Sequence, residues 1–536
     1  MRFSRLMVTA VVFWLMPFSL FSADAAAKES PAPVDLVQIK QTIEKAMKAF
    51  NVPGIAVAIV KDDKVIMSKG FGLIQMGKRD KVNADTLFGI ASNTKAFTTA
   101  ALAILADEGK LNWDDKVTDY LPSFALRDPY VTQQFTIRDM LSHRSGLGIG
   151  AGDLMIWPAS DITTDEIIKR VRYLKPMTSF RSEYAYDNLM YVMAGEIVAR
   201  VSKMSWHEFI QKRILTPLKM TQTRMRYSAI EANNHNVATA HAPVDGQIKP
   251  VGGDFLESFS SAGSIASSVN DMSQWLRVQL KGGLIDTTGD KDNRLFSGVK
   301  GIEMWTPNTL QDVPPFNEEM DRTHFRAYGL GWRLNDHQGY KMVSHTGGIM
   351  GMVSRVVMIP EKQLGVVILT NQQSGPAFYA IAHDIINRYL EVEHKDWVSI
   401  YQHKQKNKVD EGQRVVEQLM KDRDSQSRPS LALADYAKLY RDDWYGDIEI
   451  TLVDDKSKGQ KLQMRFSRTP VLIGELEHFQ HNTFIVRWYD RSTNADAFVN
   501  FQLTPEGKVD IVTMQAVSPL TDFSFDFHDL LLKPQL

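Results

Sequence analysis

A charged segment at residues 396–430 divides this chain into two parts whose hydrophobic patterns differ. Charged and amide side chains crowd its two ends, at 404–408 and 421–424, and only a weak apolar stripe runs between them. Such a pattern is typical of a solvated helix that connects folded domains. The 536 residues also exceed what one hydrophobic core usually holds. We therefore expect two or three domains, with this segment as a helical linker.

The part before the linker, residues 28–395, combines strand patterns at both ends with helical patterns in the middle. Apolar runs at 54–60 and 65–67 around a polar turn predict a β-hairpin. Further apolar runs between 341 and 370 predict strands, and a helical pattern follows at 377–390. Strands at both ends favour one sheet closed by the N- and C-terminal segments, with a helical region inserted between them. The expected class is an α/β (α+β) body.

The part beyond the linker, residues 431–536, alternates apolar and polar side chains in short runs. Ile448, Ile450 and Leu452 form one such run, and turn-forming residues separate it from the next. Alternation with a period of two predicts β-strands with one buried face. The sequence therefore predicts a C-terminal all-β barrel or sandwich, whose interior is either a ligand cavity or a packed structural cap.

The first 27 residues have the layout of a secretory signal peptide. Two arginines precede an apolar run at 6–21, and the small-residue stretch 23–27 follows. This order predicts export and cleavage after Ala25 or Ala27. A retained membrane anchor is the alternative, because the apolar run is close to spanning length. We expect a periplasmic or secreted protein with no integral membrane span after cleavage.

Composition narrows the classes of function. A formal net charge of −1 gives no electrostatic reason to expect nucleic acid or an acidic membrane surface as a partner. The absence of cysteine excludes a disulfide framework, a cysteine nucleophile and cysteine-based zinc sites. A partial zinc-protease motif at His207-Glu208 has Gln211 where the second histidine is required. We expect no metal and no cofactor, and the oligomeric state stays open.

Ser92 and Lys95 are the first candidate catalytic pair. Ser92 lies between a strand-like run at 87–90 and a helical pattern at 96–109, so it is expected at a helix N-terminus, which favours developing negative charge. Lys95 follows one helical turn later on the same face. A lysine can activate a serine only if its pKa is lowered, for which apolar neighbours would serve. Ser297-x-x-Lys300 is a rival match, but no clear strand leads into it.

Two further motifs carry candidate polar groups. In Tyr186-Asp187-Asn188, a phenol near a lysine can exchange protons with the nucleophile, and an amide can bind a substrate carbonyl or the lysine. The run His345–Gly348 ends a predicted strand, and its glycines would let substrate backbone approach closely. Backbone N–H groups of Ser92 and Gly348 would then form an oxyanion hole. Each motif alone is weak evidence.

Taken in order, Ser92-x-x-Lys95, Tyr186-x-Asn188 and His345-Thr346-Gly347 resemble the penicillin-recognising serine hydrolases. That family includes class C β-lactamases, DD-carboxypeptidases, D-aminopeptidases and related esterases. The segments 141–147, 261–267 and 328–332 resemble it as well, and the C-terminal domain resembles the lipocalin-like modules that some members append. The resemblance implies a β-lactamase/DD-peptidase-like antiparallel sheet flanked by helices, with a helical subdomain.

The same resemblance implies roles for the candidate residues. Ser92 would be the nucleophile, Lys95 and Tyr186 would handle protons, and Asn188 would orient the substrate. The strand carrying His345, Thr346, Gly347 and Gly348 would bind substrate. Nothing in this set calls for a metal.

His345 stands where many β-lactamases of this family have lysine, and a histidine is only partly charged near neutral pH. This difference favours a peptidase or amidase acting on D-amino-acid-containing or small peptide substrates. A carboxylesterase or a class C-like β-lactamase is the enzymatic alternative, and a sensor of penicillin or cell-wall fragments is the non-enzymatic one. The expected partner is a small peptide, ester or lactam substrate.

Overall fold

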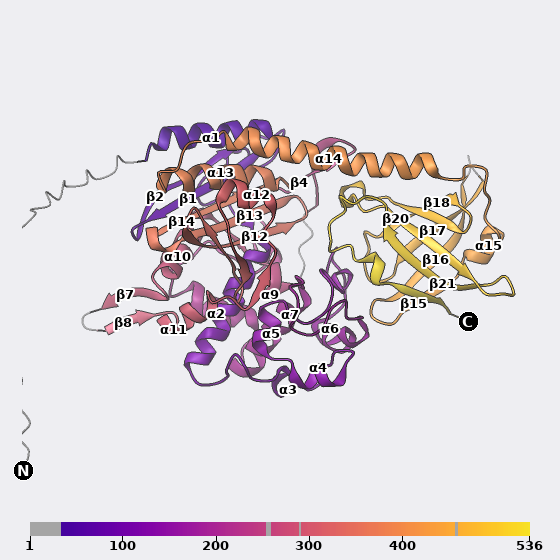
Figure 1. Cartoon of the computed structure of the whole chain (residues 1–536), viewed down its shortest axis with the longest axis horizontal. Coiled ribbons are helices and arrows are strands. Elements are labelled where there is room, and N and C mark those ends of the chain that lie inside the picture. Colours follow the sequence, from indigo (N-terminus) through magenta and orange to yellow (C-terminus); the bar gives the residue numbers. More distant parts are fainter. Residues whose placement is uncertain (1–33, 253–258, 289–290, 456–458, 536) are drawn as a thin grey trace, which may run out of the picture.

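The computed structural model describes residues 34–252, 259–288, 291–455 and 459–535, which form two bodies bridged by one long helix (Figure 1). The larger body contains an eight-stranded antiparallel sheet flanked by helices, and the smaller body is a closed eight-stranded β-barrel. The predicted fold class is confirmed in both parts. The predicted signal segment, residues 1–27, lies outside the described residues. Among the described residues, no helix combines the length and apolar character needed to cross a membrane.

The central sheet places the N-terminal hairpin beside the last strands of the larger body. Its order in space is β2 (Lys64–Gly72), β1 (Gly54–Lys61), β14 (Leu364–Thr370), β13 (Met352–Ile359), β12 (Tyr340–Ile349), β11 (Arg333–His337), β10 (Arg326–Tyr328) and β9 (Thr309–Gln311). Strands β1, β13 and β14 are apolar along nearly their whole length because both of their faces are buried.

Helices cover the two faces of this sheet with separate hydrophobic cores. On one face, Ile55, Val57 and Ile59 of β1 pack with α1 (Leu36–Ala49) and α13 (Gly375–Tyr389). On the other face, Ala56, Ala58 and Val60 join a core that contains α2 (Thr94–Asp107) and α10 (Val269–Leu280). The alternation of β1 between two cores follows from the two-residue period of a strand.

The inserted region between β2 and β9 is mainly helical. Its longest members are α2 and α7 (Leu189–Ser202), and the buried ring of Phe97 on α2 stacks on Trp275 of α10 with 3.9 Å between ring centroids. The shorter helices are α3 (Val117–Tyr120), α4 (Pro129–Gln134), α5 (Ile137–Leu141), α6 (Thr164–Arg170), α8 (Trp206–Ile210), α9 (Ser260–Gly263) and α11 (Gly298–Met304), and α12 (Pro315–Asp321) follows between β9 and β10. Three two-stranded sheets pair β3 (Phe88–Gly89) with β6 (Ala266–Ser267), β4 (His241–Val244) with β5 (Gln247–Pro250), and β7 (Leu284–Thr288) with β8 (Lys291–Arg294).

Helix α14 (Trp397–Asp422) bridges the two bodies (Figure 1). Its first turn buries Trp397, Val398 and Tyr401 in the core that contains α13, and most of its later residues are exposed. Helix α15 (Leu433–Tyr436) then leads into the barrel. The barrel strands are β15 (Leu439–Asp442), β16 (Gly446–Asp455), β17 (Gly459–Phe466), β18 (Ile473–Gln480), β19 (Thr483–Trp488), β20 (Ala497–Leu503), β21 (Val509–Ala516) and β22 (Leu531–Pro534). Pairing of β15 with β22 closes the barrel.

Large aromatic side chains fill the barrel interior. Phe466, Trp488 and Phe527 pack with ring centroids 5.6 to 6.1 Å apart, and Phe484 meets Phe501 in a T-shaped contact at 5.6 Å. Edge-to-face packing of this kind is the arrangement that buried aromatic rings prefer. The ligand cavity and the packed cap both stay predictions for this domain.

The barrel docks on the helical region through several contacts. Arg468 forms an ion pair with Glu166 at 3.0 Å and a second one with Asp161, and Arg170 donates to the carbonyl oxygens of Trp444 and Tyr445. The loop between β21 and β22 forms another contact, where the buried carboxylate of Asp526 accepts the backbone N–H of Gly152 at 2.6 Å. This loop therefore reaches the part of the larger body that contains the candidate site.

Candidate active site

Ser92 lies in a tight turn between β3 and α2. It is half-buried in the short 3-10 helix Ala91–Asn93, and Ala91 before it has a φ of 47°, a left-handed value that is unfavourable for a residue with a Cβ atom. Strand β12 contacts this turn at Gly347, where a Cβ atom would lie 2.1 Å from the carbonyl oxygen of Ile90. Only glycine permits so close an approach, so Gly347 fixes the distance between β12 and Ser92.

Lys95 is fully buried one helical turn after Ser92. Its Nζ lies 3.1 Å from Ser92 Oγ, 2.8 Å from Asn188 Oδ1 and 3.0 Å from the carbonyl oxygen of Ala262. Burial lowers the pKa of Lys95 to about 7, against the opposing charges of two nearby aspartates. The neutral amine can donate two N–H groups to the two carbonyl acceptors, which leaves its lone pair for the proton of the Ser92 hydroxyl.

Tyr186 borders the same pair. Its ring centroid is 5.0 Å from Lys95 Nζ. Burial raises the pKa of Tyr186 well above its ordinary value, although a hydrogen bond to Ser92 opposes this effect. The phenol is therefore protonated at neutral pH and can donate a hydrogen bond or a proton near Ser92.

Asn188 connects Lys95 to an acidic group that the sequence analysis did not find. Its Nδ2 donates to Asp153 Oδ2 at 2.7 Å, and the hydroxyl of Ser524 donates to the same oxygen at 2.7 Å. Burial raises the pKa of Asp153 to about 7, while these two hydrogen bonds and the charge of Lys95 lower it. Ser524 belongs to the barrel, so a chain of hydrogen bonds runs from the barrel to Lys95.

A second barrel residue forms part of the site wall. Phe523 packs edge-on against Tyr186, with 6.1 Å between ring centroids, and is 41% exposed. A Cβ atom on Gly150 would lie 2.8 Å from the Phe523 ring, so the loop around Gly150 accommodates this aromatic side chain closely. No local pattern could have revealed Ser524 or Phe523, because Ser524 lies 371 residues from Asp153 in the sequence.

His345 is buried and held at both ring nitrogens. Its Nδ1 lies 2.6 Å from the carbonyl oxygen of Thr346, and its Nε2 lies 2.8 Å from the hydroxyl of Tyr328. Burial first, and then the charges of Arg333 and Lys95, lower the pKa of His345 well below its ordinary value. The neutral ring donates from Nδ1 to the carbonyl and accepts at Nε2 from the tyrosine. It therefore fixes the strand and supplies no positive charge.

Arg333 is a second basic residue close to the tyrosines of the site, and sequence reasoning missed it. Its guanidinium carbon lies 5.7 Å from the ring centroid of Tyr186, 5.8 Å from that of Tyr184 and 5.9 Å from that of Tyr328. The only sequence signal was its place directly after the family-like segment 328–332.

The end of β12 leaves one edge open beside Ser92. Strand β11 pairs with β12 as far as Ser344, so among the described strands residues 345–349 pair only with β13. Thr346 is half-buried on this segment and Gly348 is exposed. An open strand edge offers N–H and C=O groups to an extended substrate.

Two other polar groups outside this site have structural partners. Ser297 of the rival motif caps α11 by accepting the backbone N–H of Lys300 at 3.3 Å, and Lys300 pairs with Glu303. The structure does not bring this motif near Ser92's partners. Elsewhere, Asp321, His337 and His383 form a buried cluster of potential metal-ligand groups. Arg355 and Lys404 interact electrostatically with members of this cluster, and their positive charges oppose binding of a metal cation there.

Comparison with known proteins agrees with this geometry. A family model described as Beta-lactamase matches residues 39–390, and one described as Domain of unknown function (DUF3471) matches residues 422–534. Unguisins hydrolase ungD of Aspergillus violaceofuscus is 26% identical over 507 residues, which cover 90% of this chain and 88% of the relative. Protein flp of Staphylococcus aureus is 27% identical over 351 residues, 63% of either chain.

Solved structures share the fold over most of the chain. The octameric penicillin-binding protein homologue from Pyrococcus abyssi has a TM-score of 0.59 at 23% identity, and the match covers 93% of this chain and 100% of that one. The crystal structure of SurE has a TM-score of 0.53 at 18% identity, with 93% and 98% of the two chains covered. At these identities the likeness concerns the fold.

Proposed function

The chain belongs to the Beta-lactamase family, and from this premise we propose that it is a serine hydrolase that forms an acyl-enzyme on Ser92. The observation that supports this best is the environment of Lys95. Its buried amine has two carbonyl acceptors and lies 3.1 Å from Ser92 Oγ, and its pKa is about 7. A lysine held in this way can serve as a general base at neutral pH.

In the proposed acylation step, Ser92 Oγ bonds to the substrate carbonyl carbon as Lys95 Nζ takes the hydroxyl proton. The backbone N–H groups of Ser92 and Gly348 are proposed to stabilise the oxyanion. The proton then passes from Lys95 to Tyr186 as the phenol gives its own proton to the leaving nitrogen or oxygen. The bond between the carbonyl carbon and the leaving group breaks, and both protein groups return to their starting states.

Deacylation uses the same groups in reverse. A water molecule attacks the acyl carbon and gives a proton to Lys95 by way of Tyr186. The bond from the carbonyl carbon to Ser92 Oγ breaks, and Lys95 returns the proton to that oxygen. The net reaction is hydrolysis, and no other reactant is needed.

We propose a peptidase or amidase acting on D-amino-acid-containing or small peptide substrates. The neutral state of His345 supports this choice, because the strand then lacks the fixed cation that a lysine would provide at that position. The order of basic, apolar and small residues in the N-terminal segment supports export to the periplasm or secretion, which we propose as its location.

The test compares the wild-type protein with its Ser92→Ala variant and with Ser297→Ala as a matched control. Each is treated with a fluorescent penicillin and with a panel of D-amino-acid amides, short peptides, esters and nitrocefin. We expect turnover of amides or peptides that Ser92→Ala abolishes and Ser297→Ala keeps. Turnover that survives in Ser92→Ala would refute the nucleophile assignment. Labelling at Ser92 without turnover would identify a sensor instead, and a better ester or nitrocefin rate would refute the peptidase choice.

A further inference from the structure

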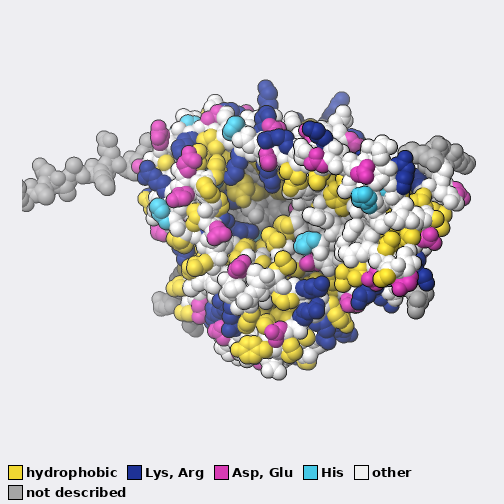
Figure 2. Space-filling model, turned by 45° about the vertical axis from the view of Figure 1, so that its right-hand side comes forward, with side chains coloured by type: hydrophobic (Ala, Val, Ile, Leu, Met, Phe, Trp, Pro, Cys, Tyr) yellow, Lys and Arg dark blue, Asp and Glu magenta, His cyan; other side chains and the backbone are white. Residues whose placement is uncertain are grey.

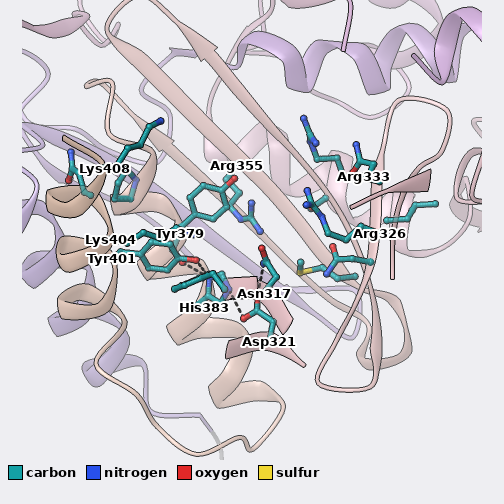
Figure 3. Close-up of a pocket in the computed structure, with 18 of the residues that line it drawn as sticks. Asn317, Asp321, Arg326, Arg333, Arg355, Tyr379, His383, Tyr401, Lys404 and Lys408 are labelled. Carbon is teal, nitrogen blue, oxygen red and sulfur yellow. Dashed lines mark hydrogen bonds and ion pairs between the residues drawn. The ribbon is translucent and has the colours of Figure 1, made fainter. Parts of the chain in front are cut away.

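A pocket of about 550 Å³ lies between the sheet and helices α12, α13 and α14. The space-filling view shows the larger body hollowed near the linker helix, with Lys and Arg side chains along the rim (Figure 2). Five cationic residues line the pocket: Arg326, Arg333, Arg355, Lys404 and Lys408. They come from three strands and one helix, and Figure 3 shows the arginines projecting from the sheet towards the space between the elements.

Strand register explains why the three arginines share one face. Arg355 lies opposite Thr346 on β12, and Arg333 lies opposite Ser344, two residues away. Arg326 lies opposite Asn335, which is two residues from Arg333 along β11. Since side chains two residues apart lie on the same side of a strand, all three project from the same face of the sheet.

These five cations lack carboxylate partners among the described residues, in which no ion pair involves any of them. Arg355 is 4% exposed, its Nε has no hydrogen-bond partner, and its guanidinium stacks 4.5 Å from the ring centroid of Tyr379. A buried cation is normally paired, because removal of its hydration is costly.

The single carboxylate in the pocket lining does not supply this pairing. Asp321 accepts from Asn317 Nδ2 at 2.8 Å and lies 3.1 Å from His383 Nε2. Burial lowers the pKa of Lys404, and the charge of Lys408 lowers it further while Asp321 opposes the change. The pKa of Arg326 is lowered as well, first by burial and then by the charge of Arg333. The pocket lining therefore carries an excess of positive charge, with five basic side chains and one carboxylate.

The pocket adjoins the candidate active site through Arg333. This residue lines the pocket, and its guanidinium also lies 5.7 Å from the Tyr186 ring. Ser344 lines the pocket as well and lies two residues from Thr346 on β12, so both side chains are on the same face, and Thr346 belongs to the segment whose edge is open beside Ser92. A molecule bound beside Ser92 can thus extend past Arg333 into the pocket.

We propose that this pocket is an anion subsite of the active site, which binds carboxylate groups of the substrate and so directs the enzyme to acidic peptides. The inference rests on the proposed function. Guanidinium groups bind carboxylates with two parallel hydrogen bonds, which suits the buried arginines, and the exposed lysines add charge at the opening. Lys404 and Lys408 belong to α14, outside the matched segment 39–390, so the linker helix contributes to the substrate preference.

The kinetic test uses pairs of peptide substrates that differ only by Glu or Gln next to the scissile bond. The variant Lys404→Gln/Lys408→Gln removes two charges at the opening, and Lys406→Gln is the matched control on the same helix because its ammonium pairs with Asp410. We expect the wild type to prefer the Glu substrate. The double variant should lower the ratio of kcat/KM for Glu over Gln by roughly tenfold, as two exposed charge pairs allow, and the control should keep it. An unchanged ratio in the double variant would overturn the proposal.

A binding measurement separates this proposal from the proposed function. In the Ser92→Ala protein, calorimetry should show N-acetylglutamate binding roughly tenfold more tightly than N-acetylglutamine, with the difference reduced by Lys404→Gln/Lys408→Gln. Equal affinities would overturn the subsite. Tight binding of inorganic phosphate without a kinetic preference for Glu substrates would also overturn it, by identifying a phosphate site. Loss of the proposed hydrolase function alone would leave this binding result to decide.

Discussion

The substitution Asp153→Asn tests whether the charge next to Asn188 sets the proton affinity of Lys95. The negative charge of Asp153 raises the pKa of Lys95 against the lowering effect of burial. The base form of Lys95 is the neutral amine, so wild-type kcat/KM should rise with pH and level off above about 7. Removal of the charge lowers the pKa of Lys95, and the rise should occur at lower pH. Asparagine keeps the shape and an acceptor oxygen for Ser524.

The size of the effect follows from the hydrogen-bond chain. Contacts of 2.8 Å from Lys95 to Asn188 and 2.7 Å from Asn188 to Asp153 are separated by one amide group. The two charges are thus roughly 7 Å apart, and at an effective dielectric constant of about 20 they interact by about 2.4 kcal/mol. If Asp153 were fully ionised, removal of its charge would lower the pKa of Lys95 by about 1.7. Because the pKa of Asp153 is itself about 7, the carboxyl is partly protonated where Lys95 titrates. We therefore expect the rise in kcat/KM to move to lower pH by about one unit.

The assay is the pH profile of kcat/KM for the best substrate, with Asp161→Asn as the control. Asp161 also contacts the barrel, but it does so through Arg468 on the outer side, and its side chain is 71% exposed. The control should keep the wild-type profile. An Asp153→Asn profile that stays in place or moves to higher pH would refute the electrostatic coupling, provided that the melting temperature shows a folded protein.

Three further substitutions test contacts around Ser92. Gly347→Ala places a Cβ atom against the backbone and should reduce the free energy of unfolding by about 1–3 kcal/mol and the rate of hydrolysis by at least roughly tenfold. The control is Gly298→Ala, whose Cβ atom would meet no atom within 4 Å and should change neither quantity. Tyr328→Phe leaves the buried Nε2 of His345 unpaired and should cost about 1–3 kcal/mol in chemical denaturation; an unchanged midpoint would contradict the assigned hydrogen bond. Ser524→Ala removes one hydrogen bond to the Asp153 carboxylate and should lower kcat about fivefold, while circular dichroism shows an intact barrel. An unchanged kcat would show that this barrel contact does not affect catalysis.

Sequence patterns could predict those parts of the site that depend on local geometry. Ser92 and Lys95 are three residues apart, and a strand-to-helix boundary is enough to place them on one face. The glycines at 347 and 348 were predicted to admit substrate backbone, which stays a prediction, whereas the structure shows that Gly347 admits the carbonyl oxygen of Ile90. In the same way, the alternation of apolar and polar residues in the C-terminal domain predicted the strands, which pair with one another to close into a barrel.

The remaining features depend on long-range contacts that one sequence does not encode locally. The neutral state of His345 depends first on its burial and then on the charges of Arg333 and Lys95, which come from other elements. The five pocket cations without an ion-pair partner among the described residues come from four elements, which must assemble before the charges meet. In the sequence Lys404 and Lys408 were simply part of a charged, solvated linker, which is also what an exposed helix face requires.

The barrel affects the protonation of Lys95 by excluding water from Asp153 as well as through the hydrogen bond of Ser524. Asp153 is buried because the loop carrying Phe523, Ser524 and Asp526 covers it, and burial is the main cause of its raised pKa. If this loop withdrew, water would reach Asp153, its pKa would fall, and a full negative charge would face Lys95. Hydration and that charge would both raise the pKa of Lys95 and reduce the fraction of neutral amine at pH 7. The docked barrel therefore favours the base form of Lys95, and a hydrolase domain without it is expected to be active only at higher pH.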